Sequence, residues 1–221
     1  MSWHLHLLNA RGVLTPWEHA IRDGIERARL RAAGCIELPV LDLVVQAVKD
    51  GGIPELGHVG HAPRPGAIFI TLDPDNPNLV RHMGEAFERM VVHELHHALR
   101  WDAVGYGRTL GEAIVSEGLA GRFVQELFGG EGEPWDRALT EEQFAALLPR
   151  LRQELKAERY NHAAWFFGRG DLPRWAGYGF AWGIVGKYLA RSPERRPSRL
   201  AGVLAAEVLS LLDHESGVSV A

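Results

Sequence analysis

The segment VVHELHHALRW, residues 91–101, places three histidines and a glutamate within five positions of an otherwise apolar run. His93 and His97 are four residues apart, so on a helix they project from one face about one turn apart. Two imidazoles in this arrangement can bind one zinc ion from the same side. Glu94 can reach a water held by that ion without becoming a ligand itself. The spacing therefore predicts metal-assisted hydrolysis, with Glu94 as the general base.

His96 allows a second interpretation of the same segment. His93 and His96 are three residues apart on a helix and could also bind a metal, which would leave His97 to contact the substrate or another ligand. We favour the pair His93 and His97, because it fits the general-base geometry. The plainest role for His96 is then a hydrogen bond to a nearby carbonyl or carboxylate. The apolar flanks predict a partly buried face, where an unsatisfied polar cluster would be costly.

A tetrahedral catalytic zinc site needs a third protein ligand and one open position. Glu117, in the segment IVSEGLAGRF, is the best candidate. It lies twenty residues after His97, among small residues that would let two helices approach closely. Glu112 competes for this role, but its place in a capping box explains it without a metal. Glu126 and Asp102 are weaker candidates.

Hydrolysis also needs a hydrogen-bond donor for the oxyanion that develops on the scissile carbonyl. Tyr178 is the first candidate, because Gly177 and Gly179 on either side leave room for close approach. His162 is the second candidate, since a neutral imidazole near a cleft could serve as well. The alternative for Tyr178 is a core tyrosine whose hydroxyl bonds a carbonyl.

The elements that must position these residues can be read from caps and periodicity. Thr15, Pro16 and Glu18 resemble a capping box at the start of a helix that Gly34 ends. Residues 40–48 and 66–73 are rich in β-branched and apolar residues, which predicts two strands, and residues 56–61 predict a weaker one. Further helices are expected over residues 79–101, 110–128, 140–160, 175–190 and 198–213.

Strands that come early and helices that follow predict an α+β fold. We expect a single domain over residues 1–221. Within it, residues 1–78 form the N-terminal helix and small sheet, and residues 79–128 form the helices with the candidate ligands. The mostly helical remainder is residues 129–221. Pro149 should break or kink its helix.

Composition excludes several classes of function. The formal charge of −4 over 221 residues gives no reason to expect nucleic acid or an anionic membrane as a partner. Cys35 is the only cysteine, so neither an intrachain disulfide nor a cysteine zinc cluster is expected. Neither a signal peptide nor a membrane span is expected, and the default location is the cytoplasm.

The motif HELHH, followed twenty residues later by the glutamate of SEGLA, resembles the gluzincin metallopeptidases. More narrowly, it resembles a bacterial protein family that is classified as a domain of unknown function. Its members are predicted to be zinc-dependent proteases. The segments FITLDPDNPN and WFFGRGDLPRWAGYGFAWGIVGKYL extend this likeness over roughly residues 65–190. The resemblance implies a zincin-like fold, zinc ligands at His93, His97 and Glu117, and Glu94 as catalytic base.

One position departs from the pattern of that family. Many gluzincins have an acidic residue four positions after the ligand glutamate, where it bonds a ligand histidine, and this chain has Gly121 there. The partner of the histidines must therefore come from elsewhere.

The expected function is a peptidase with one Zn²⁺ per chain, acting on a peptide or protein substrate. The strand AIFITL, residues 67–72, could supply backbone hydrogen bonds to an extended substrate, or it could be purely structural. A zinc-stabilised interaction or chaperone-like protein with little proteolytic activity is the alternative. A third hypothesis is a metallohydrolase that acts on a non-peptide amide.

Overall fold

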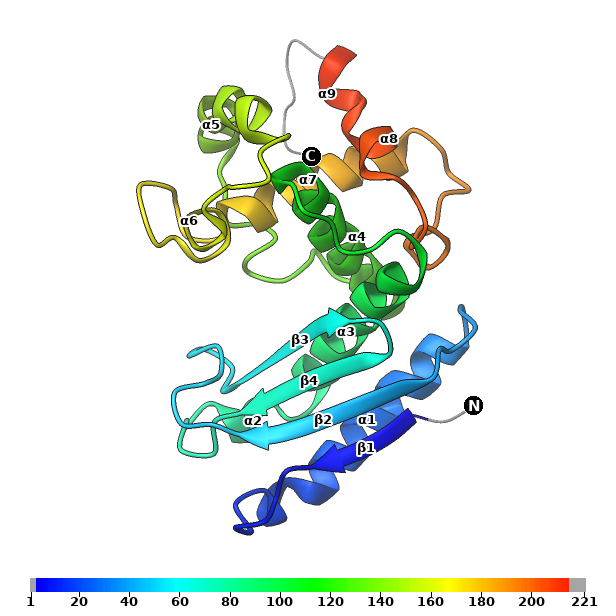
Figure 1. Cartoon of the computed structure of the whole chain (residues 1–221), viewed down its shortest axis with the longest axis vertical. Coiled ribbons are helices and arrows are strands. Elements are labelled where there is room, and N and C mark those ends of the chain that lie inside the picture. The colour runs from blue at the N-terminus through cyan, green and yellow to red at the C-terminus, as the bar shows by residue number, and fades with distance from the viewer. Residues whose placement is uncertain (1–2, 215–221) are drawn as a thin grey trace. The chain divides into compact units, whose positions relative to one another are not determined.

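The computed structural model describes residues 3–214, which form the elements shown in Figure 1. Their order is β1 (Trp3–Leu7), a 3-10 turn (Thr15–Trp17), α1 (Glu18–Ala33), β2 (Leu41–Ala47), β3 (His58–Arg64), β4 (Ala67–Leu72), α2 (Leu79–His82), α3 (Glu85–Ala103), α4 (Leu110–Phe128), α5 (Glu141–Glu154), α6 (His162–Phe167), α7 (Ala176–Ala190), a 3-10 turn (Pro197–Arg199), α8 (Ala205–Leu209) and α9 (Leu211–His214). The predicted α+β class is confirmed.

Contacts between residues divide the chain into two compact units, Met1–Asp102 and Ala103–Ala221. We call them the N-terminal unit and the C-terminal unit. The organisation of the whole chain as a single domain stays a prediction.

The N-terminal unit contains a four-stranded sheet with the order β1-β2-β4-β3. β2 pairs in parallel with β1 and with β4, whereas β3 pairs antiparallel with β4. The three predicted strands are present. β1 was not predicted, although its segment WHLHL alternates apolar and polar residues and its exposure alternates accordingly.

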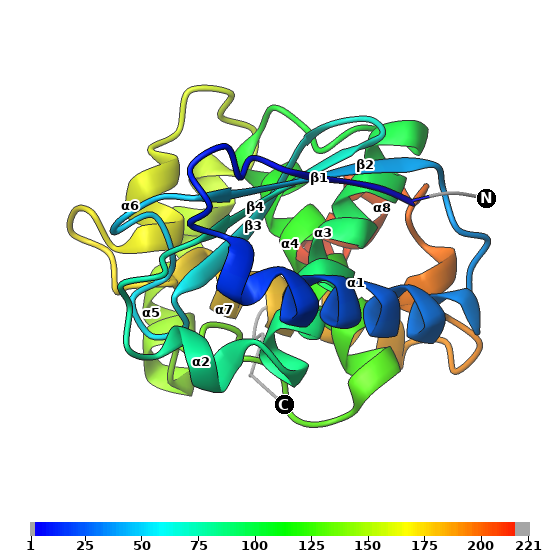
Figure 2. The same cartoon turned by 90° about the horizontal axis from the view of Figure 1, so that it is seen from below.

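Helices α1 and α3 cover one face of this sheet, as Figure 2 shows. They approach closely at Gly24, where an added Cβ would lie 2.6 Å from the ring of Phe87. An ion pair of 2.6 Å between Arg27 and the buried Glu88 also links them. α3 is thereby held against both α1 and the sheet.

The helices of this unit differ from the prediction in two places. Thr15 does not cap α1, because Asn9 bonds both the Thr15 hydroxyl and the Leu14 amide, and the chain first makes a 3-10 turn. The predicted helix over 79–101 is divided into α2 and α3 at Met83 and Gly84. There the Gly84 carbonyl accepts bonds from the amides of Phe87 and Glu88, in the first turn of α3, and so begins a new helix.

In the C-terminal unit, α4 and α7 pack directly on each other. At Gly118 an added Cβ would lie 2.4 Å from the carbonyl oxygen of Ala181. Glycine is therefore needed where the two backbones meet. The predicted capping box of Glu112 is present at the start of α4, where it is formed with Thr109, and the helix spans the predicted residues 110–128.

The other helices of this unit differ in detail from the expectation. Pro149 lies inside α5 and the helix continues to Glu154, six residues short of the predicted end. α6 was not expected, and the side chain of Asn161 caps it. The predicted helix over 198–213 is replaced by a 3-10 turn and the short helices α8 and α9. Within the described residues, no helix has the length and apolar character that crossing a membrane requires.

Candidate metal centre

The predicted histidine pair lies on α3 with the expected spacing. The Nε2 atoms of His93 and His97 are 3.0 Å apart, and their rings meet edge to face with centroids 4.7 Å apart. Zinc–nitrogen bonds measure about 2.0–2.1 Å, so two nitrogens at this separation can contact one ion. His97 is buried and His93 is partly exposed. The pair is therefore suited to a metal on one side of the helix.

Glu94 is buried on the same helix, with 7% of its surface exposed. It packs against Gly60 of β3, where an added Cβ would lie 2.4 Å from Glu94 Cγ and 2.6 Å from Met90 Sδ. The absence of a side chain at Gly60 thus leaves the space that Glu94 occupies. β3 and α3 together fix the position of the candidate base.

β3 is an edge of the sheet among the described strands. The Gly57 carbonyl accepts from the Asp73 amide, and in the antiparallel register Val59 and His61 are the next residues bonded to β4. The amide and carbonyl of Gly60 therefore face away from the sheet. A bulge follows His61, and the Trp101 indole of α3 donates to the Ala62 carbonyl at 2.7 Å.

This topology decides between the two interpretations of the segment AIFITL in favour of the structural one. The segment AIFITL is β4, which lies between β2 and β3 and pairs with both. Its backbone groups are engaged within the sheet, so β4 cannot present a row of them to an extended substrate. The edge strands among the described residues are β1 and β3, and β3 is the one that contacts Glu94.

Glu117 lies in the middle of α4 and is 7% exposed. The hydroxyl of Tyr106 donates a hydrogen bond of 2.5 Å to Glu117 Oε1. Desolvation, and then the charge of the Glu117 carboxylate, raise the pKa of Tyr106 well above its usual value. Sequence reasoning missed Tyr106, and its single signal was its place between Gly105 and Gly107.

The ligand atoms of His93, His97 and Glu117 lie within 4.8 Å of one another. Two imidazole nitrogens and one carboxylate oxygen are a donor set found in catalytic zinc sites, where a fourth position stays open. The residues present therefore fit a zinc ion by their chemistry and by the spacing of the histidine pair.

The competing acids have other partners. Glu112 accepts bonds from the amides of Arg108 and Thr109, which fits its predicted role as a cap. Glu126 accepts two bonds of 2.8 Å from Ser198. Asp102 is exposed and His96 is fully buried.

Tyr178 and His162 belong to one aromatic cluster in the C-terminal unit. Phe166 stacks on His162 with centroids 4.5 Å apart and meets Tyr178 edge to face at 5.0 Å. The Tyr160 hydroxyl lies 3.1 Å from His162 Nδ1. Burial, followed by the charges of Glu117 and Glu112, raises the pKa of Tyr160 to about 12. The roles of Tyr178 and His162 in catalysis stay predictions.

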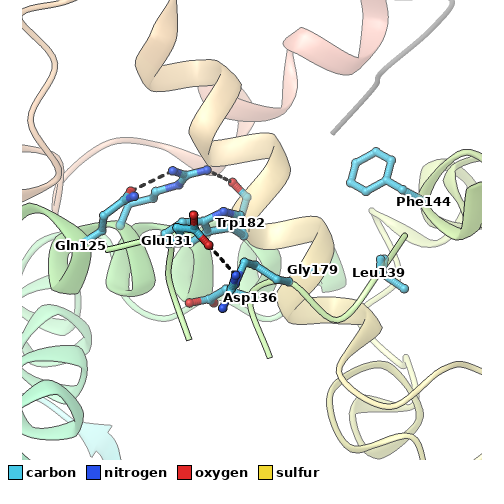
Figure 3. Close-up of a pocket in the computed structure, with 9 residues that line it drawn as sticks. Gln125, Glu131, Asp136, Leu139, Phe144, Gly179 and Trp182 are labelled. Carbon is cyan, nitrogen blue, oxygen red and sulfur yellow. Dashed lines mark hydrogen bonds and ion pairs between the residues drawn. The ribbon is translucent and has the colours of Figure 1, made fainter. Parts of the chain in front are cut away.

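A separate cavity of about 420 Å³ lies in the C-terminal unit and is shown in Figure 3. Its charged groups include Arg122, whose guanidinium donates to Gln125 and to the Trp182 carbonyl and lies 3.5 Å above the Trp182 ring. Burial lowers the pKa of Arg122 to about 10. An added Cβ at Gly121 would lie 3.3 Å from Asp136 Oδ1, another group of this cavity. None of the predicted ligand or catalytic residues lines it.

The fold and these residues define an α+β protein with a potential metal site of two histidines and one glutamate. The chain belongs to the family described as "Predicted Zn-dependent protease (DUF2268)", which matches residues 18–210.

Two relatives from Bacillus subtilis (strain 168) are similar to parts of the chain. The uncharacterized protein YjfC is 27% identical over 117 residues, which cover 51% of this chain and 38% of that protein. The uncharacterized protein YjaZ is 32% identical over 110 residues, which cover 47% of this chain and 42% of that protein. The matches thus span about two fifths of the length of these curated relatives. No solved structure matches the chain.

Proposed function

We propose that the chain is a zinc-dependent peptidase of the gluzincin type that binds one zinc ion through His93, His97 and Glu117. The observation that carries this proposal is the proximity of the three ligand atoms, within 4.8 Å of one another. Membership of a family described as predicted zinc-dependent proteases supports it. The 3.0 Å separation of the two Nε2 atoms adds support, because it suits a single cation.

A zinc ion held there would polarise the scissile carbonyl and lower the pKa of a water molecule. Glu94 follows His93 directly and is not needed as a ligand. We assign it as the base that takes a proton from the attacking water and gives it to the leaving amine. Its packing against Gly60 supports this role, because a base that transfers two protons in turn must be held in one place.

A peptide is favoured as the substrate because an open strand edge runs beside Glu94. The outward amide and carbonyl of Gly60 can bond an extended chain, as added strands do at other sheet edges. Since an added Cβ at Gly60 would lie 2.4 Å from Glu94 Cγ, a substrate backbone bonded to this residue would lie near the base.

Tyr178 is proposed as the donor that stabilises the developing oxyanion, with His162 as the second candidate. Both belong to one aromatic cluster around Phe166, and the cluster includes Tyr160, whose pKa the charge of Glu117 helps to raise. A donor in such a place can rest near the reacting carbonyl without binding the metal tightly.

The test is a digest of an unbiased peptide library with zinc-loaded protein, run beside the variant Glu94→Gln at the same zinc content. We expect cleavage products from the native protein and almost none from the variant. Equal cleavage by both proteins would exclude Glu94 as the base.

A zinc-stabilised interaction protein with little proteolytic activity is the second candidate. The observation that favours it is Gly121, which stands where many gluzincins have an acidic residue. In the same digest, stoichiometric zinc with cleavage by neither protein would favour this candidate over the peptidase.

A further inference from the structure

Glu117 needs a partner if it is to hold a metal in a fixed geometry. A glutamate side chain has several rotatable bonds, and ordering it costs conformational entropy. Glu117 is also buried, with 7% of the residue exposed, so protein groups must replace the water that its carboxylate loses. Ligating carboxylates are themselves hydrogen-bonded, and these outer partners orient the oxygen that binds the metal.

Tyr106 makes the contact that this role requires. Its hydroxyl donates to Glu117 Oε1 at 2.5 Å, a length typical of a strong bond from a hydroxyl to a carboxylate. This bond fixes the orientation of the Glu117 carboxylate. We propose that Tyr106 is a positioning residue, which orients the Glu117 carboxylate so that it can bind the metal. The proposal rests on the proposed function, which identifies Glu117 as a ligand.

The loop that carries Tyr106 is itself fixed to α4. The Ser116 hydroxyl donates to the Tyr106 carbonyl at 2.7 Å, so consecutive residues of α4 bond the backbone and the side chain of Tyr106. Gly107 has a φ of 107°, which disfavours any other residue, and an added Cβ there would lie 2.2 Å from Glu112 Cβ. Tyr106 is therefore held in place before a metal binds, which lowers the cost of ordering Glu117.

The test is the zinc affinity of the full chain, measured by competition with a chromophoric chelator. Tyr106→Phe deletes the hydroxyl and keeps the ring. We expect zinc to bind about 10- to 100-fold more weakly, the usual cost of losing an outer partner of a ligand. The matched control is Tyr188→Phe, because the Tyr188 hydroxyl also donates to a glutamate, Glu207, which is not a candidate ligand. Zinc affinity should be unchanged in this control.

Two further measurements separate a positioning role from a general loss of stability. Cobalt bound in place of zinc should show a changed visible spectrum in Tyr106→Phe and an unchanged one in Tyr188→Phe, since the spectrum reports ligand geometry. In the background of Glu117→Ala, Tyr106→Phe should weaken zinc binding no further. A second variant, Ser116→Ala, should weaken zinc binding less than Tyr106→Phe does, because it removes only the bond to the loop.

The result that would overturn the proposal is unchanged zinc affinity in Tyr106→Phe while Glu117→Ala loses zinc. An equal loss from Tyr106→Phe with and without Glu117 would also overturn it, because Tyr106 would then act by another route. Failure of the proposed function looks different. If Tyr106→Phe weakens zinc binding but the native protein cleaves no peptide, the positioning role holds and the peptidase assignment fails.

Discussion

Helix α3 buries several ionisable side chains, whereas α4 buries one, Glu117, among apolar and small residues. The buried ionisable residues of α3 are Glu88, Glu94, His96, His97 and Arg100. On α3 the histidine pair is made within the helix, by residues four apart. On α4 the partner that Glu117 needs comes from Tyr106, in the loop before the helix. The comparison teaches that a candidate ligand pair within one helix is visible in a sequence, while the partner of a single candidate ligand depends on contacts that only the fold creates.

The largest effect expected is on metal content, and it tests whether both helices supply ligands. His93→Ala, His97→Ala and Glu117→Ala should each lose most of the zinc that the native chain carries, close to one ion per chain. Elemental analysis of the purified proteins measures this.

The controls for this experiment test whether α4 contributes a ligand and which of the two possible histidine pairs binds the metal. His19→Ala, on the exposed surface of α1, should keep its zinc. Full zinc in Glu117→Ala would remove α4 from the site. Replacement of His96 should deplete zinc much less than replacement of His97, and the reverse order would make His93 and His96 the pair.

The next largest effect distinguishes the proposed base on α3 from the proposed ligands on the same helix. Glu94→Gln keeps the shape of the side chain and removes the proton acceptor, so zinc should stay while turnover falls about 10²-fold or more. Steady-state cleavage of a peptide at matched zinc content measures it. Turnover close to that of the native protein would exclude Glu94 from the proton transfer.

A smaller effect tests how β3 supports α3. Gly60→Ala adds a Cβ that would lie 2.4 Å from Glu94 Cγ, so the base must move. We expect zinc to be retained and kcat to fall about 10- to 100-fold, because displacements of about 1 Å are costly in an active site. Gly84→Ala is the matched control, since an added Cβ there has no neighbour within 4 Å. Native kcat in Gly60→Ala would show that β3 does not fix Glu94.

The smallest effect expected concerns Tyr178, in the C-terminal unit. Tyr178→Phe should leave zinc content and Tm unchanged and lower kcat at least about tenfold, if its hydroxyl stabilises the oxyanion. Kinetics and thermal unfolding of the same preparation measure both. A lower Tm with unchanged activity per folded molecule would make Tyr178 a core residue, and His162 would become the candidate donor.

Contacts between residues close in the sequence could be predicted, and contacts that depend on distant segments could not. The histidine pair and the capping box at Thr109 follow from helical spacing. The cap expected at Thr15 failed because Asn9 competes for its hydroxyl. The order of the strands, which makes β3 an edge and encloses β4, depends on pairing between segments far apart in the chain. Tyr106 has no motif of its own, and only the turn between Gly105 and Gly107 brings it to Glu117.

The pairing of the sheet also has a consequence for how the chain assembles as it is synthesised. β1 pairs with β2 only after α1 has been made, whereas β3 and β4 form a local antiparallel hairpin. β4 is the last strand of the sheet to leave the ribosome, yet it is the inner neighbour of both β2 and β3. Local pairs close at less entropic cost than distant ones. Assembly is therefore favoured from the hairpin back toward β1, in the opposite direction to synthesis, and only the short helix α2 separates the hairpin from α3 in the chain.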